Sequence, residues 1–294
     1  MANSAYKLRM GDRKEGRQIR SLAPFYKIMP FIMVKRNDAM NDFADSIEVS
    51  ELDRWLREKR AEGYKGMGML HVFIAAYVRT VAYRPGLNRF VSGQRIFARN
   101  NIEVVLAVKK SLSTDSAETT IKVIFEPTDT IFDVYRKLNA KIDEVKANTG
   151  ENNTEQAAAA FMKTPRLVLK FGIWLINLLD YFGLLPQALL DASPFHGSMI
   201  ISDLGSLGIP PIYHHIYNFG NLPLFICFGA KRRVVELDDE GVPTKRKYVD
   251  YKVTMDERII DGLYYATAFK YIKHYLHNPT GLELPPEKVD EDIL

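Results

Sequence analysis

The chain has 294 residues, of which 47% are hydrophobic, enough to build one large domain with a substantial core. Its 40 Lys and Arg residues against 36 Asp and Glu leave a net charge of +4, far from the strongly basic balance typical of nucleic-acid-binding proteins. The single cysteine, Cys227, excludes an internal disulfide, and the N-terminal stretch lacks the apolar core of a signal peptide. We therefore predict a cytoplasmic protein with no nucleic-acid partner and a single domain over residues 1–294, flexible at 1–15 and 285–294.

Two helices are predicted in the first third of the chain. Residues 50–63 carry apolar side chains on one face, with Ser50 as the N-cap and Asp53 in the capping-box position. Residues 69–86 are apolar on most sides, so this helix should be buried. His71 lies on it and is expected to be a hydrogen-bonded core residue.

Two more helices follow at a distance. Residues 129–147 place apolar side chains on one stripe behind a cap formed by Asp129 and Thr130. The last helix, residues 261–279, begins at Asp261, a predicted N-cap, and ends at an Asn-Pro pair.

Strands are predicted between these helices because β-branched and aromatic residues dominate there, in part with period-two alternation. A hairpin connection is expected at the Asp-Asp-Glu-Gly run after Leu237. The predicted strands cover residues 101–108, 119–126, 197–205, 223–237 and 247–257. Helices interspersed with long strands and hairpins indicate an α/β protein with a mixed sheet.

Residues 161–190 form a predicted hydrophobic helical insertion, and the part from 167 to 190 is nearly long enough to cross a bilayer. Lys170, Asn177 and Asp180 form one narrow polar stripe on this helix. Three alternatives remain open: a helix buried in the core or in a subunit interface, which we favour, a helix on a membrane surface, and a membrane span.

Three motifs in chain order resemble the catalytic core of the dihydrolipoamide acyltransferases of 2-oxoacid dehydrogenase complexes and, more distantly, chloramphenicol acetyltransferase. They are NNIEVVLAV, GSMIISDLGSLG and MDERIIDGLYYATAF, and the similarity runs over nearly the whole chain. The resemblance implies a chloramphenicol acetyltransferase-like mixed β-sheet with flanking helices, assembled as a homotrimer or a higher multiple of trimers. It also suggests a stand-alone member without the lipoyl and subunit-binding modules.

The chemistry that the resemblance implies is acyl transfer between coenzyme A, as a cosubstrate, and a small-molecule thiol or hydroxyl acceptor, with no covalent cofactor and no metal ion. In that family a loop histidine is the general base, and a serine of the neighbouring subunit hydrogen-bonds the oxyanion. Ser202 matches the serine, and Arg258, Asp261 and Gly262 match the loop. Glu257 stands where the family has its histidine.

Glu257 raises the question of whether the loop still performs catalysis. A general base works best with a pKa near ambient pH, and an ordinary glutamate, at about 4.3, is further from it than imidazole, at about 6.5. Burial in an apolar channel would raise the pKa of the carboxylate and recover part of the difference. The alternative is a catalytically inactive relative that binds an acyl-CoA or a partner, or serves as a scaffold.

Two further groups of residues are candidates for the site. His214 and His215 follow the serine strand and could supply an imidazole from a new position, or they pack at a subunit interface. Lys231, Arg232 and Arg233 are predicted to lie opposite residues 245–247 across the hairpin, where they could bind the phosphates of coenzyme A or remain solvated. Cys227 is expected to be a buried, inert thiol.

Overall fold

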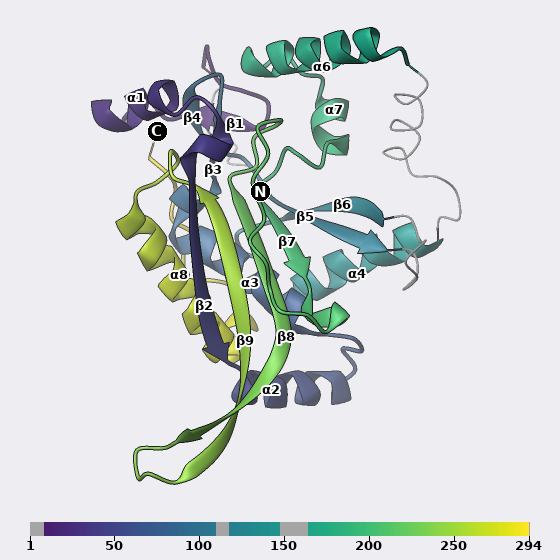
Figure 1. Cartoon of the computed structure of the whole chain (residues 1–294), viewed down its shortest axis with the longest axis vertical. Helices are drawn as coiled ribbons and strands as arrows, with labels where there is room; N and C mark the ends of the chain where they lie inside the picture. The colour runs from purple at the N-terminus through teal and green to yellow at the C-terminus, as the bar shows by residue number, and fades with distance from the viewer. Residues whose placement is uncertain (1–8, 110–117, 148–163, 294) are drawn as a thin grey trace.

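The computed structural model describes residues 9–109, 118–147 and 164–293, and a six-stranded mixed sheet is its largest element. The strand order is β2-β9-β8-β7-β5-β6; β7 runs parallel to both of its neighbours, and the other pairs are antiparallel (Figure 1). The strands span Met40–Glu48 (β2), Ile102–Lys109 (β5), Glu118–Phe125 (β6), Met199–Asp203 (β7), Leu224–Leu237 (β8) and Pro243–Asp256 (β9). The mixed α/β class is confirmed.

Five of these strands were predicted, and β2 was not. Its sequence is mostly polar, but it pairs with β9 along its whole length, from Met40 opposite Asp256 to Glu48 opposite Tyr248. A smaller sheet of order β1-β4-β3 was also missed. Its strands span Gly16–Gln18 (β1), Arg89–Ser92 (β3) and Arg95–Arg99 (β4).

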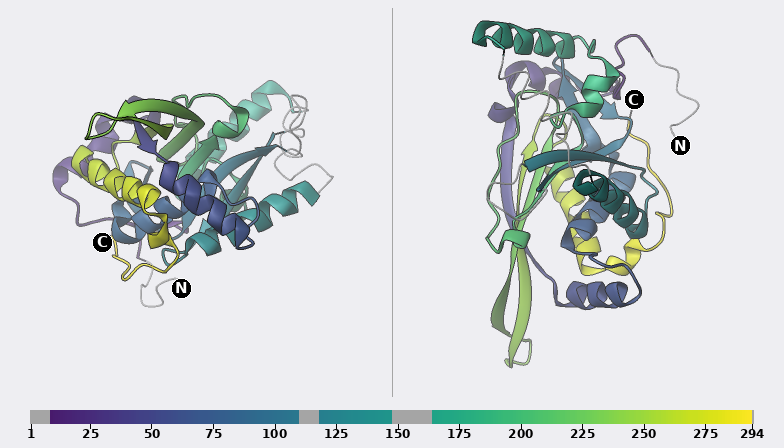
Figure 2. Two further views of the ribbon diagram at one scale, coloured as in Figure 1. Left: turned by 90° about the horizontal axis from the view of Figure 1, so that it is seen from below. Right: turned by 90° about the vertical axis from the view of Figure 1, so that its right-hand side faces the viewer.

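The four predicted helices are confirmed, and they cover one face of the large sheet (Figure 2). They span Ser50–Ala61 (α2), Met69–Tyr83 (α3), Ile131–Ala147 (α4) and Gly262–His277 (α8). The remaining α-helices among the described residues span Pro24–Ile32 (α1), Arg166–Tyr181 (α6) and Gln187–Ala192 (α7).

The core lies between the sheet and these four helices. Leu224, Ile226 and Phe228 of β8 point into it on alternate positions, and Phe228 stacks on Phe73 of α3 with 4.7 Å between ring centroids. His71 is buried and bonded at both ring nitrogens, as expected: it accepts from the Gly68 amide and contacts Asn139.

The predicted capping box of α2 is wrong. The N-cap position belongs to Val49, and no side chain caps the helix. Asp53 is instead buried beside the hairpin, where it pairs with Lys231 of β8 and, at 3.1 Å, with Lys247 of β9. The long hairpin brings these two cations to Asp53, and their charge-assisted hydrogen bonds hold the carboxylate there instead of at the amides of the helix.

The hydrophobic segment forms α6 and α7, and its burial in the core of this chain is a prediction that the structure corrects. On α6 only Asp180 is buried, where it accepts a hydrogen bond from Arg13 at 3.3 Å. The space against the sheet is already filled by the other helices, so the apolar face of α6 points outward. Gly183, with φ of +71°, follows the C-terminal end of α6. Residues 161–163 lie outside the described ranges.

The ends of the chain hold several packed side chains. Arg13 and Glu15 are buried, and Asp292 accepts a hydrogen bond from Arg89 at 2.7 Å. Contacts do not measure motion, so the flexibility of residues 9–15 and 285–293 stays a prediction, and residues 1–8 and 294 lie outside the described ranges.

Candidate active site

The loop Asp256–Gly262 joins the end of β9 to the start of α8. Asp261 is the N-cap of α8, as predicted: its side chain accepts from the Tyr264 amide at 2.7 Å. Its second oxygen accepts from the Tyr26 hydroxyl of α1 at 2.9 Å. The backbone hydrogen bond from Tyr264, followed by the one from Tyr26, lowers the pKa of Asp261, so this carboxylate is ionised at neutral pH and anchors the loop.

Asp256 and Arg258 form a buried ion pair at the base of the loop. Two Arg258 nitrogens donate to the two oxygens of Asp256, at 2.6 and 2.8 Å. A second buried cation, Arg36, lies 3.4 Å from Asp256 and donates to the carbonyl of Tyr217. Burial lowers the pKa of Arg36 to about 10, and the attraction of Asp256 opposes that shift. The charge of Arg258 is thus largely neutralised within the loop.

Glu257 lies between these two residues and points the other way. Its backbone amide donates to the carbonyl of Ala39, and one carboxylate oxygen accepts from the Asn41 amide of β2 at 2.8 Å. The residue is half-buried. The carboxylate therefore stands at the end of the sheet in a defined orientation, set by the pairing of β2 with β9.

Ser202 lies on the sheet face opposite the helices. In the register of the sheet it stands beside Cys227 of β8, which stands beside Lys252 of β9. Cys227 is buried, as predicted, and burial raises the pKa of its thiol although Ser202 and the Ile212 backbone oppose the shift. Its predicted inertness stays a prediction.

Ser202 and Glu257 of one copy are far apart. Lys252 precedes Glu257 by five residues, about 16 Å along β9, and two strand spacings of about 10 Å in total separate it from Ser202. The two side chains are thus about 19 Å apart by register and cannot contact the same carbonyl carbon. A site that uses both needs a second copy of the chain.

Residues 209–222, called the strap below, cross the face that carries Ser202 (Figure 2). Its first residue, Ile209, accepts from the amide of Ala230, and the Ile216 amide lies 3.4 Å from the Met40 sulfur. The strap thus runs along β8 toward the Asp256–Gly262 loop, and the Tyr217 carbonyl meets Arg36 at its end.

The two adjacent histidines of the strap, His214 and His215, have different environments. His214 stacks on Phe225 at 4.2 Å between ring centroids, and its Nε2 is buried without a hydrogen-bond partner among the described residues. Burial, and then the neighbouring His215, lowers its pKa, so the ring is neutral at pH 7. Phe225 and Ser202 lie on the same face about 8 Å apart by register. His215 is exposed.

The basic residues of the hairpin are only partly free to bind a ligand. Arg233 lies opposite Lys247, as predicted. The prediction is wrong for the other two, because Lys231 lies opposite Val249 and Arg232 opposite Tyr248. Lys231 pairs with Asp53, and Arg232 pairs with Asp250 at 2.8 Å. Arg233 is exposed.

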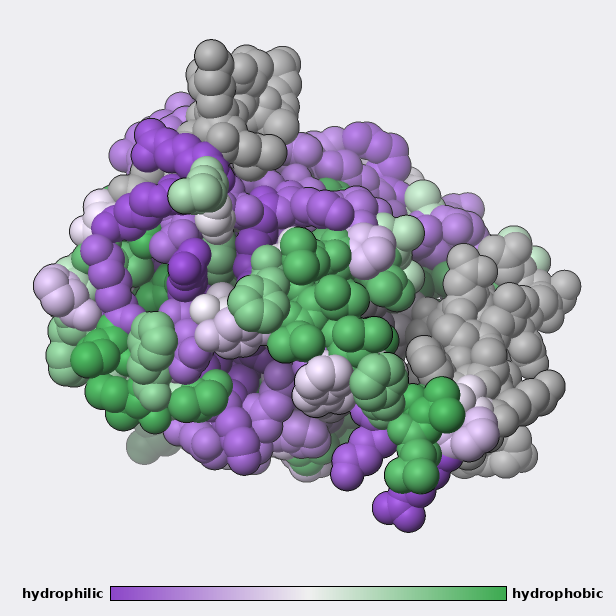
Figure 3. All heavy atoms as spheres, turned by 90° about the horizontal axis from the view of Figure 1, so that it is seen from above, coloured by the Kyte–Doolittle hydropathy of each residue, from purple (hydrophilic) through white to green (hydrophobic). Residues whose placement is uncertain are grey.

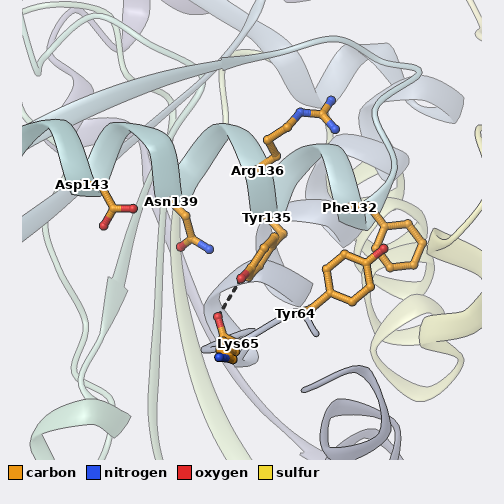
Figure 4. Close-up of a pocket in the computed structure, with 7 residues that line it drawn as sticks. All are labelled: Tyr64, Lys65, Phe132, Tyr135, Arg136, Asn139 and Asp143. Carbon is orange, nitrogen blue, oxygen red and sulfur yellow. Dashed lines mark hydrogen bonds between the residues drawn. The ribbon is translucent and has the colours of Figure 1, made fainter. Parts of the chain in front are cut away.

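Three of the cavities among the described residues are relevant to the search for a ligand site. One of about 450 Å³ lies beside the start of the strap and is lined by Pro210, Arg232 and Lys252. A second, of about 270 Å³, opens between the end of α1 and α6 and reaches Arg36 and Arg258. The third, of about 580 Å³, lies against α4, where Tyr64, Phe132 and Tyr135 form an aromatic cluster, and none of the predicted site residues lines it (Figure 4).

Sequence reasoning missed the groups that hold the candidate site in place. Arg36 and Asn41 belong to stretches with no motif, and they reach the loop only because β2 pairs with β9. Within the described parts of the chain, no group of three or more His, Cys, Asp or Glu side chains is arranged to bind a metal ion.

Solved structures with the same fold identify its class. One is a probable dihydrolipoamide acetyltransferase from Listeria monocytogenes, with 16% identity, a TM-score of 0.57 and 90% of this chain and 95% of that chain covered. Another is the dihydrolipoamide acetyltransferase of Azotobacter vinelandii, studied for the role of a serine, a histidine and an asparagine in its catalytic mechanism, with 13% identity, a TM-score of 0.56, and 94% and 96% covered. Chloramphenicol acetyltransferase matches with 13% identity, a TM-score of 0.53, and 89% and 99% covered.

These similarities show that the chain has the chloramphenicol acetyltransferase-like fold shared by dihydrolipoamide acetyltransferase cores, as its motifs predicted. Models of protein families give no match, and neither do curated proteins. At such low identity the comparison describes the fold, and the function has to be argued from the site.

Proposed function

We propose that the protein transfers an acyl group from coenzyme A to a thiol or hydroxyl acceptor at a site shared by two copies. Glu257 of one copy is the general base, and Ser202 of the next copy donates a hydrogen bond to the oxyanion. The observation that carries the proposal is the geometry of the Asp256–Gly262 loop: Asn41 and the Asp261 cap fix Glu257 at the end of β9, while Ser202 of the same copy is out of its reach.

The reaction follows from these two groups. The Glu257 carboxylate takes the proton of the acceptor S–H or O–H as the acceptor atom attacks the thioester carbonyl carbon. The carbonyl oxygen becomes an oxyanion, to which the Ser202 hydroxyl donates a hydrogen bond. The bond from that carbon to the coenzyme A sulfur then breaks, and the departing sulfur regains a proton from Glu257. Asp261 contacts no reacting atom and positions the loop.

Coenzyme A and the assembly are part of the same proposal. Lys231, Arg232 and Arg233 would bind the phosphates of coenzyme A. Arg233 is exposed. Lys231 and Arg232 would have to leave Asp53 and Asp250, their partners in this structure, to bind a phosphate. A homotrimer would provide a site shared between copies. We place this homotrimer in the cytoplasm. The Azotobacter enzyme was studied for the role of a serine, a histidine and an asparagine in its catalytic mechanism, which supports the choice of Ser202, Glu257 and Asp261 from the motifs of this chain.

The first test is release of free thiol from acetyl-CoA and longer acyl-CoAs in the presence of candidate acceptors. Glu257→Gln is expected to lower kcat by about 10²- to 10⁴-fold, since general-base catalysis contributes that much. Glu62→Gln is the matched control because Glu62 is an exposed glutamate at the C-cap of α2, where it pairs with Lys59. A Glu257→Gln variant with unchanged kcat would rule out the carboxylate as the base.

His214 is the alternative base, because its neutral ring has an unpartnered nitrogen and stacks on Phe225, on the sheet face that carries Ser202. His214→Phe keeps the stacking on Phe225 and removes that nitrogen. We expect this variant to keep its activity; an inactive His214→Phe with an active Glu257→Gln would assign the imidazole instead. Binding of acyl-CoA without turnover by the unmodified protein, whatever the acceptor, would indicate the non-catalytic alternative.

The shared site has its own test. Glu257→Gln and Ser202→Ala variants should each be inactive alone. Co-expressed in one assembly, they should regain part of the activity, because Glu257 of a Ser202→Ala copy can meet Ser202 of a Glu257→Gln copy. No recovery in verified mixed assemblies would contradict a site between copies.

A further inference from the structure

The outward face of α6 is apolar along its whole length. Exposed side chains on the face directed away from the protein are Leu167, Val168, Phe171, Trp174, Leu175, Leu178 and Tyr181. Their spacing of three and four residues places them on one side of the helix, and the opposite side, with buried Asp180, meets the protein. An amphipathic helix of a globular protein normally turns its apolar face toward the core and its polar face toward solvent.

A second exposed apolar helix lies beside it. Phe25, Ile28, Phe31 and Ile32 of α1 are all at least half exposed and share one face of the helix. The cavity of about 270 Å³ is lined by Val34, two residues after α1, and by Tyr181 of α6, so the C-terminal end of α6 lies across this cavity from the segment that follows α1.

Both helices lie at one end of the molecule, opposite the tip of the β8–β9 hairpin (Figure 1). Seen from that end, hydrophobic side chains gather in the middle of the surface and again on its left, the side on which α1 lies in Figure 1 (Figure 3). Isolated apolar residues are normal on a protein surface, but two helices with exposed apolar faces at the same end of the molecule mark a surface that binds something.

The charged residues on α1 and α6 themselves are positive, apart from the buried Asp180. Residues 16–37 contain five Lys or Arg and no Asp or Glu, and the only acid between 164 and 190 is the buried Asp180. Arg166 and Lys170, both exposed, lie on one edge of the apolar face of α6, and Lys27 and Lys35 are exposed on and after α1. An apolar face edged by cations is complementary to the acyl chains and the negative headgroups of an anionic membrane.

We infer that α1 and α6 bind the surface of an anionic lipid bilayer, with both helices lying in the plane of the interface. A bilayer accommodates the apolar faces and the cations together. A second copy of the chain placed there by a twofold axis would bring these same cations face to face, with no exposed acid on either helix to pair with them. None of the described helices is long and apolar enough to cross a membrane.

Bilayer binding orients the rest of the molecule. The cavity of about 270 Å³ is lined both by Tyr181 of α6 and by Arg258 of the Asp256–Gly262 loop, so this loop lies near the end that binds the bilayer. The hairpin tip, at the other end, points away from the membrane (Figure 1). The inference does not depend on the proposed acyl transfer.

Vesicle flotation of the whole purified protein tests the inference directly. The protein should float with vesicles of phosphatidylcholine containing phosphatidylglycerol, and much less with phosphatidylcholine alone. Trp174 provides an independent signal, because it is 55% exposed while the other tryptophan, Trp55, is 6% exposed. In a Trp55→Phe variant, anionic vesicles should shift the emission of Trp174 to shorter wavelength.

Variants separate the apolar from the charged contribution. Phe171→Glu combined with Leu178→Glu should reduce vesicle binding by about tenfold or more, since two buried apolar groups are replaced by charges. Arg166→Gln and Lys170→Gln should each reduce binding to anionic vesicles by about fivefold. The matched control is Leu237→Glu in the hairpin, where Leu237 is 69% exposed, and it should bind as the unmodified protein does.

Two results would overturn the inference. One is the absence of flotation and of any Trp174 shift with anionic vesicles. The other is an oligomer in solution that the Phe171→Glu, Leu178→Glu variant dissociates, because the face would then be covered by another copy of the chain.

Discussion

The two faces of the large sheet differ in kind, although the same strands supply both. Toward the helices, β8 presents Leu224, Ile226 and Phe228 to a continuous apolar core. Toward the strap, the alternate positions present Phe225 and Cys227, next to Ser202 of β7 and Lys252 of β9. Because side chains alternate along each strand, the residues that stabilise the core lie on one face and the candidate site residues lie on the other.

The covering of the two faces differs as well. Four helices pack on the first, whereas the second is crossed by a strap without helix or strand, held at Ala230, Met40 and Arg36. A strap with few backbone partners can adjust to a substrate or to a neighbouring copy more readily than a packed helix. We therefore expect substitutions to cost stability on the helix-covered face and less on the strap-covered face.

The largest expected effect is on the helix-covered face. Phe228→Ala should lower the free energy of unfolding by about 4 kcal/mol, because it removes a fully buried ring stacked on Phe73. Phe225→Ala, its counterpart under the strap, should cost about half as much because the strap can settle into the space. Urea unfolding measures both. Equal losses would show that the two faces are packed alike.

A buried charge at the end of the strap-covered face should come next. Asp256→Asn leaves Arg258 and Arg36 buried without their carboxylate, with an expected cost of about 3 kcal/mol. Asp250→Asn is the control, since its pair with Arg232 is partly exposed and should be worth less than about 1 kcal/mol. Similar losses in the two variants would show that the Asp256 pair is not shielded from solvent.

The strap also predicts a pH dependence. Burial lowers the pKa of His214, so below its ordinary value of 6.5 the unfolded chain binds a proton that the folded chain does not. Stability should therefore fall as the pH is lowered through 6.5. Thermal unfolding from pH 7 to pH 5 should show a smaller fall in Tm for His214→Phe than for the unmodified protein. The remaining fall reflects His71 and His277, whose pKa values burial also lowers. Parallel curves would show that the His214 ring is solvated.

The smallest effect is expected at the hairpin. Burial by itself raises the pKa of Asp53, but the hydrogen bonds from Lys231 and Lys247 outweigh it and leave the pKa below its ordinary value of 3.8. The ion pairs therefore stabilise the fold above that pH and lose their effect as the pH falls below it. Because both lysines are partly exposed, Asp53→Asn should cost about 1 kcal/mol or less at pH 7. A loss that does not diminish in high salt would contradict a solvent-screened pair.

Much of the fold could be predicted from local pattern. The periodicity of apolar residues predicted the four helices on the sheet and five of the strands. The order of the motifs predicted the chloramphenicol acetyltransferase-like fold. The N-cap role of Asp261 was also readable, because a cap depends on residues three apart in the chain. In contrast β2, with its mostly polar sequence, and the short strands β1, β3 and β4 gave no comparable signal.

The sequence by itself determined which segments have an apolar side, and it identified Ser202, Glu257 and Asp261 as candidates through their motifs. Only the tertiary structure decided where those sides point: burial of α6 in the core of this chain is wrong because other helices already cover the sheet, whereas burial in a subunit interface, the other half of the favoured alternative, stays a prediction. It also decided that Asn41 holds Glu257, that Asp53 pairs with the hairpin instead of capping α2, and that Ser202 and Glu257 of one copy lie far apart. The physical reason is that helical and strand periods are local, whereas strand register and the competition of elements for one sheet face join residues that are distant in the chain.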